Sequence, residues 1–266
     1  MNERNFYGPL HVADGSREGA PYDNSIFEHP EDPESRIVRP VSPNMYSSET
    51  EMYDQLRASD VLRADAMSHG IQIVPFEYTQ DAAGEVLQIV EKIPNAVGVS
   101  TLFESRDMTD DQAYEISVAL ENMASYFTHV ARDMEGNLFS EEMLRMDQAV
   151  YSPDLTPGQR VVIVDVEPFA IELVYPGEAE VYDGFASHLT RATAILVRDA
   201  CRLVELSGEG LRAKDQIVQL IDSLGVQEEN SRRMVEVLRT ALADEQISEG
   251  LNRLADAEHI DGLDEE

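Results

Sequence analysis

The sequence predicts an α+β fold in which a strand-rich N-terminal part precedes a helical C-terminal part. Short runs rich in β-branched residues occur before residue 94, whereas long segments with apolar residues at helical spacing follow residue 110. The chain has 266 residues, of which 42% are hydrophobic and 27% charged. These values are typical of a folded globular protein, so we expect neither a disordered nor a fibrous chain.

The N-terminal part is expected to contain a hairpin, a helix and a second hairpin. The strands are indicated by alternating or β-branched residues next to turns that are rich in proline, glycine or acidic residues. The helix is indicated by apolar residues at helical spacing after a polar start. The expected order is a hairpin from 25–29 and 36–39, a helix that ends at Gly70, and a hairpin from 71–78 and 86–93.

The C-terminal part is expected to be mainly helical. The preceding segment, 94–109, shows no clear periodicity and is predicted to be a linker. Helices are predicted where apolar residues repeat at helical spacing: 110–133, 180–206, 211–224 and 228–257. Four consecutive β-branched residues at 161–164 predict a buried strand between the first two of these helices.

The strongly acidic composition limits the classes of partner. Asp and Glu total 52 against 20 Lys and Arg, so the formal net charge is −32. Such a surface repels phosphate groups, and we expect no binding to nucleic acid or to a membrane. Adaptation to a salty cytoplasm, a GC-rich genome or a basic partner are alternative sources of the acidity.

Cysteine content and the N-terminal sequence indicate the compartment. Cys201 is the only cysteine and has no partner for an internal disulfide. The first residues lack the apolar stretch of a secretory signal, and no apolar run, including 161–164, is longer than four residues. The sequence therefore predicts a cytoplasmic protein.

Polar residues at the ends of two short apolar runs form the most informative pattern. Asp165 directly follows the predicted strand 161–164. The pair Asp147-Gln148 directly precedes a second short apolar run, 149–151. If the two runs form a hairpin, Gln148 and Asp165 become neighbours, which suits a divalent metal. The alternative is that Asp165 only caps a turn.

The order of these elements resembles the protein-kinase-like fold over about residues 24–175. The sequence Asp-Val-Glu at 165–167 resembles the choline-kinase-like and aminoglycoside-phosphotransferase-like branch, in which Asp-Phe-Glu is common. The resemblance implies two lobes, a small β-rich N-lobe and a mostly helical C-lobe. It implies this division: a flexible segment 1–23, an N-lobe 24–93, a linker or hinge 94–109, a C-lobe with a small hairpin 110–257, and an acidic tail 258–266.

The same resemblance implies an ATP site and a Mg²⁺ site. Arg39 takes the position of the strand lysine, with Glu49 or Glu51 as its helix partner. By the resemblance, the segment with Glu91 and Ile93 is expected to contact the adenine of ATP. The implied metal ligands are Asp165 and Gln148.

Several positions depart from the family pattern. Arg39 replaces the lysine, Gln148 replaces an asparagine, and Met143 stands where the catalytic aspartate belongs. A register shifted by one residue restores two carboxylates, with Glu142 as the base and Asp147 as the metal ligand.

Three functions follow from these departures. The first is a degenerate kinase, a pseudokinase that retains Mg-nucleotide binding and acts as a scaffold or regulator. The second is an active small-molecule or protein phosphotransferase that uses Asp165 and Glu142. The third is a non-enzymatic module that binds a protein partner through its C-terminal helices. Apolar stripes on these helices carry that alternative, although such stripes also form cores.

Overall fold

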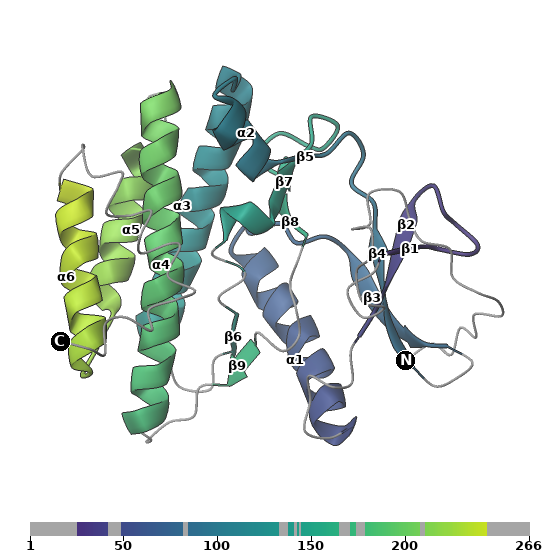
Figure 1. The fold of residues 1–266 in the computed structure, drawn as a ribbon, viewed down its shortest axis with the longest axis horizontal. Coiled ribbons are helices and arrows are strands. Elements are labelled where there is room, and N and C mark those ends of the chain that lie inside the picture. The colour runs from purple at the N-terminus through teal and green to yellow at the C-terminus, as the bar shows by residue number, and fades with distance from the viewer. Residues whose placement is uncertain are drawn as a thin grey trace. The chain divides into compact units, whose positions relative to one another are not determined.

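The computed structural model shows an α+β chain with a small antiparallel sheet near the N-terminus and a mostly helical C-terminal part (Figure 1). The predicted fold class is therefore confirmed. The residues that the structure describes are 26–41, 49–81, 85–132, 138–140, 143, 145–164, 171–173, 179–207 and 211–243. The chain divides into two compact units, an N-terminal unit of 1–59 and 74–95 and a C-terminal unit of 60–73 and 96–266. The expected segments 1–23 and 258–266 lie outside the described residues.

A four-stranded antiparallel sheet forms the N-terminal unit. Its strands are β1 (Phe27–Glu28), β2 (Arg36–Pro40), β3 (Phe76–Gln80) and β4 (Val86–Glu91), in the order β1-β2-β4-β3. The pairs β1/β2 and β3/β4 are the two predicted hairpins. The second hairpin begins at Phe76 rather than residue 71, because Ile73 instead forms a parallel bridge to Ile163 in the C-terminal unit.

Both faces of this sheet are apolar. One face carries a buried cluster of four residues: Phe27, Val38, Leu87 and Ile89. The other face packs against helix α1 (Glu49–Ser68), where Leu56 contacts Val86. The helix is held to the sheet because side chains that alternate along a strand present one apolar row to each side.

Helix α1 ends at Ser68, two residues before the glycine at which its end was predicted. Gly70 has a φ of 89°, a left-handed conformation that favours glycine at the end of a helix. Its backbone amide donates to the carbonyl of Met67, and the amide of Ile71 donates to that of Ala66. A Cβ at this position would lie 2.8 Å from Nδ2 of Asn122, so a larger residue would have to displace that side chain.

The segment expected to be a linker contains regular structure. A short strand β5 (Val97–Gly98) is followed by helix α2 (Val99–Ser105). Helix α3 (Asp110–Arg132) begins where predicted. Its start is fixed by a capping box, in which the amide of Gln112 donates to Oγ1 of Thr109 and Oε1 of Gln112 accepts from the amide of Thr109.

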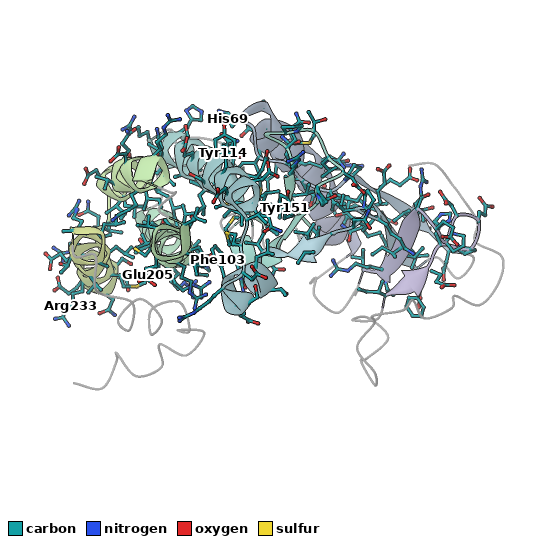
Figure 2. All side chains as sticks on the ribbon, turned by 90° about the horizontal axis from the view of Figure 1, so that it is seen from above. His69, Phe103, Tyr114, Tyr151, Glu205 and Arg233 are labelled. Atoms are coloured by element: carbon teal, nitrogen blue, oxygen red, sulfur yellow. The ribbon has the colours of Figure 1, made fainter. Side chains whose placement is uncertain are left out.

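Three further helices complete the C-terminal unit: α4 (Ala179–Ser207), α5 (Leu211–Ser223) and α6 (Glu229–Ala243). Helices α4 and α5 pack against α3, and α6 packs against α4 and α5. Figure 2 shows these helices nearly end-on. Their predicted starts are confirmed within one residue, and the predicted part of the last helix beyond 243 is not described. Among the residues with assigned positions, no helix combines the length and apolarity needed to cross a lipid bilayer.

Two small sheets complete the C-terminal unit. Strands β7 (Ala149–Tyr151) and β8 (Val161–Ile163) form an antiparallel hairpin, and β5 pairs with β7. The second sheet pairs β6 (Leu138–Ser140) with β9 (Ile171–Leu173). The sequence indicated neither β6 nor β9.

Candidate functional site

The hairpin predicted around the metal site is present. Ala149 pairs with Ile163, and the amide of Val164 donates to the carbonyl oxygen of Gln148 at 2.9 Å. Gln148 ends a short 3₁₀ helix, η4 (Met146–Gln148), whose chain continues directly into β7. The structure therefore places Gln148 beside Val164, the residue before Asp165 in the sequence. Asp165 itself lies outside the described residues.

Paired strands bound the two segments that carry the candidate residues. Ser140 at the end of β6 pairs with Ile171 at the start of β9, and Ala149 pairs with Ile163. The segment 141–148 and the segment 164–170 thus both begin and end at paired strands. Glu142 falls in the first segment but outside the described residues.

Two described residues of the first segment bear on catalysis. Met143 is fully buried, with 0% of its surface exposed. Asp147 forms a bidentate ion pair with Arg145, with Nη2 to Oδ2 at 2.9 Å and Nε to Oδ1 at 3.2 Å. The position that should hold a base by the count from Gln148 is therefore apolar, and the carboxylate of Asp147 already has a cationic partner.

The donor chemistry of this hairpin end fits Mg²⁺. Magnesium prefers carboxylate and carbonyl oxygens and keeps several of its waters, so one or two protein ligands suffice. The half-buried Gln148 offers an amide oxygen, and Asp165 offers a carboxylate. Within the described ranges no three His, Cys, Asp or Glu residues form a group suited to a metal.

The predicted nucleotide residues all belong to the N-terminal unit. Arg39 lies on β2 opposite Gln88, on the sheet face that α1 covers. Glu51 lies in the first turn of α1, like Glu49, and neither side chain is described. Glu91 is the exposed last residue of β4, and the half-buried Ile93 follows two residues later. The structure thus brings Arg39 and α1 to one face of the sheet.

A carboxylate that the sequence analysis missed lies beneath the hairpin. Glu115 of α3 is only 2% exposed. Its Oε1 and Oε2 accept the amide of Gly158 at 2.8 and 2.9 Å, and Oε2 accepts the amide of Arg160 at 3.3 Å. A signal existed, because Glu115 sits between Ala113 and Ile116 on the apolar side of a predicted helix.

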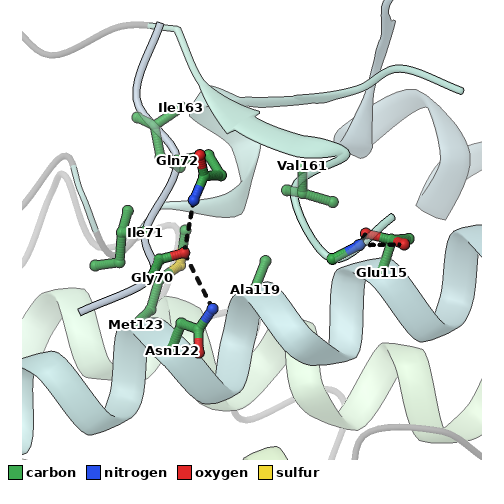
Figure 3. Close-up of a pocket in the computed structure, with 10 residues that line it drawn as sticks. Gly70, Ile71, Gln72, Glu115, Ala119, Asn122, Met123, Val161 and Ile163 are labelled. Carbon is green, nitrogen blue, oxygen red and sulfur yellow. Dashed lines mark hydrogen bonds between the residues drawn. The ribbon is translucent and has the colours of Figure 1, made fainter. Parts of the chain in front are cut away.

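A small pocket adjoins Glu115 and is drawn in Figure 3. It lies between α3, the hairpin and residues 70–72, where the carbonyl of Gly70 accepts from the side chains of Asn122 and Gln72. The open space is about 10 Å³, room for about one water molecule. This pocket is too small for a nucleotide.

A second carboxylate of α3 contacts the same hairpin. The hydroxyl of Tyr151, a residue labelled in Figure 2, donates to Oδ2 of Asp111 at 2.7 Å. Arg160 forms an ion pair with the same oxygen. Burial, followed by the hydrogen bond to Asp111, raises the pKa of Tyr151 above its usual value, so the hydroxyl stays a donor at neutral pH. Asp111 and Glu115 together attach the hairpin to α3.

Comparison with known proteins gives little further guidance. No family model matches the chain, and no curated protein matches it. Among solved structures, the chain resembles one described as WaaP in complex with acyl carrier protein, with 11% sequence identity over 80% of each chain. The TM-score is 0.36, and a likeness of this degree carries no argument about function.

Proposed function

We propose that this chain is a kinase-like pseudoenzyme that binds a Mg-nucleotide and acts as a scaffold or regulator. The observation that carries the proposal is the hydrogen bond from the amide of Val164 to the carbonyl of Gln148. It fixes the backbone of Gln148, a residue with an amide side chain, next to the strand that leads into Asp165. Two oxygen donors at adjoining strand ends suit a magnesium ion that neutralises the phosphates of ATP.

The same segment argues against efficient phosphoryl transfer. A buried methionine at position 143 cannot accept a proton from a substrate hydroxyl. The shifted register, with Glu142 as the base and Asp147 on the metal, would require Asp147 to leave its bidentate pair with Arg145. Arg39 is also a poor replacement for the lysine point charge that recruits phosphates. Loss of these groups costs several powers of ten in rate.

The first prediction is that ATP stabilises the chain in a magnesium-dependent way. A ligand that binds only the folded state raises the free energy of unfolding by about 2.7 kcal/mol at 100 times its Kd. We expect ATP with MgCl₂ to raise the melting temperature in differential scanning fluorimetry more than ATP with EDTA does. MgCl₂ without nucleotide is the control. Equal melting temperatures with and without millimolar Mg-ATP would refute the proposal.

Two carboxylate variants then assign the metal ligand. Asp165→Asn should abolish the magnesium-dependent part of the shift, whereas Asp147→Asn should preserve it because Asp147 is engaged by Arg145. The reverse result would favour the active phosphotransferase in its shifted register. That alternative also requires ATP turnover in the unmodified chain that disappears in Glu142→Gln, and we expect no such turnover.

A further inference from the structure

We infer that Glu115 is a positioning residue for the metal-binding end of the β7/β8 hairpin. The inference rests on the proposed function, since it assigns to that site a residue that acts through the backbone rather than by touching the ligand. The structural basis is a buried carboxylate on α3 that accepts three hydrogen bonds from the turn before β8.

The chemistry of this contact explains why Glu115 is buried. A carboxylate removed from water is costly unless hydrogen-bond donors replace its hydration. Here the amides of Gly158 and Arg160 supply these donors. Glu115 and its position at the pocket are shown in Figure 3. Gly158 has a φ of 82°, a left-handed conformation that favours glycine at this turn. The turn is therefore held on helix α3 by a carboxylate that is almost fully buried.

The position of this turn determines the position of strand β8. The carbonyl of Arg160 accepts the amide of Ser152, and β8 pairs with β7 from Val161 to Ile163. On its other edge, the amide of Ile163 donates to the carbonyl of Gln72 at 2.9 Å. Three residues lie between Arg160 and Val164, and the four steps of extended chain between the two span about 13 Å. A shift of the turn along α3 is thus transmitted to the hydrogen bond between Val164 and Gln148.

Asp111 does not replace this function of Glu115. Its side chain is 55% exposed, so water competes for the hydrogen bonds from Tyr151 and Arg160. Glu115 is buried, and its donors are backbone amides of the turn. Unlike the side chains of Tyr151 and Arg160, these donors cannot rotate away from the carboxylate. We therefore assign the position of the turn to Glu115.

The test compares Glu115→Gln with Ile217→Val in the full chain. Gln keeps the size of Glu but turns an NH₂ group toward the turn amides, whereas Ile217 is a fully buried residue of α5 whose truncation lowers stability elsewhere. We expect the Kd for ATP with Mg²⁺ to rise about 10- to 100-fold in Glu115→Gln, by isothermal titration calorimetry. The Kd for ATP in EDTA should not change, and neither Kd should change in Ile217→Val.

The other possible results distinguish a failure of the inference from a failure of the proposed function. Glu115→Gln could have a lower melting temperature but an unchanged ratio of the Kd for ATP with Mg²⁺ to the Kd for ATP in EDTA. In that case the residue is only a turn cap and the inference is wrong. If Glu115→Gln does not fold, Glu115→Asp, which keeps the charge, should still show a smaller rise that is confined to Mg-ATP. An unchanged ratio there overturns the inference as well.

A measurement without nucleotide covers the case in which the unmodified chain binds no Mg-ATP. The proposed function then fails, but amide hydrogen exchange still reports on the hairpin. We expect faster exchange at the Val164 amide in Glu115→Gln than in Ile217→Val, because the turn no longer fixes β8. Equal exchange rates at Val164 would overturn the inference by themselves.

Discussion

Asp199 is a carboxyl group inside helix α4 with only 1% of its surface exposed. Its Oδ1 accepts from Nε of Arg198 at 2.9 Å, and its Oδ2 has no hydrogen-bond partner among the described residues. Burial raises the pKa of Asp199 above its usual value, and the charges of Arg198 and Arg202 oppose this only in part. The ionised form of this residue is therefore unfavourable in the folded chain.

This residue makes a specific contribution to the pH dependence of stability. Because the pKa is higher in the folded than in the unfolded state, the folded chain binds the proton more tightly at pH values above 3.8, the ordinary pKa. The stabilisation is complete below that pH and is lost as the pH rises through the folded-state pKa. Asp199→Asn removes this titration.

We therefore expect the free energy of unfolding of the unmodified chain, minus that of Asp199→Asn, to fall as the pH is raised. Urea denaturation at several pH values measures this difference. Glu205→Gln, a change at an exposed carboxyl on the same helix, controls for the general effect of pH. A difference that rises with pH would show that the Arg198 pair outweighs the burial of Asp199.

At the scale of elements, the apolar stripes of the C-terminal helices form a core within this chain. Ile217, Leu220 and Ile221 of α5 are 0% exposed, as is Leu238 of α6. Helix α5 packs against α3, α4 and α6. The feature that suggested a partner-binding module is thus used for intramolecular packing at these positions.

Truncation separates packing from partner binding. We expect Leu220→Ala to lower the free energy of unfolding by about 2 to 5 kcal/mol, because it leaves a cavity in the bundle. Val218 of the same helix is 43% exposed, and Val218→Ala should change stability by no more than about 0.5 kcal/mol. Urea denaturation of both variants checks this. Similar small effects at both positions would indicate a face that is available to a partner.

Elements with a local pattern were predictable from the sequence, whereas those that depend on distant pairing were not. The capped helix α3 and the hairpin β3/β4 carry their signals within about 25 residues. Strands β6 and β9 have three residues each and pair across more than 30 positions, so no periodicity indicates them. The contact of Glu115 with Gly158 spans 43 positions for the same reason. The site was predicted as a hairpin end, but its attachment to α3 was not.

For the molecule as a whole, the formal charge of −32 opposes compaction. Arginine pairs with acidic residues at several places on the surface, as in Arg63 with Asp60 and Arg233 with Glu229. Exposed pairs of this kind contribute little to stability. Most acidic residues have no basic counterpart to balance them, since 52 acidic residues face 20 basic ones.

Salt should therefore stabilise the chain. The screening length of charges in water is about 10 Å at 0.1 M salt and becomes shorter as the salt concentration rises. Raising KCl from about 0.05 M to about 0.5 M therefore weakens the repulsion between carboxylates. We expect the melting temperature and the urea midpoint to rise over this range. NaCl should give the same result if screening is the cause. A lower stability at high salt would show that attractive pairs dominate.

The boundary between the two units falls inside helix α1, between Ser59 and Asp60, and this affects how the gene can be divided. A fragment that starts at residue 96 looks like a natural helical domain, but it lacks 60–73. It would lose the carbonyl of Gln72 that accepts from Ile163, and Asp65, which accepts from the hydroxyl of Tyr126. We therefore expect the helical part to fold only within the complete chain, or in a circularly permuted chain that rejoins 60–73 to it.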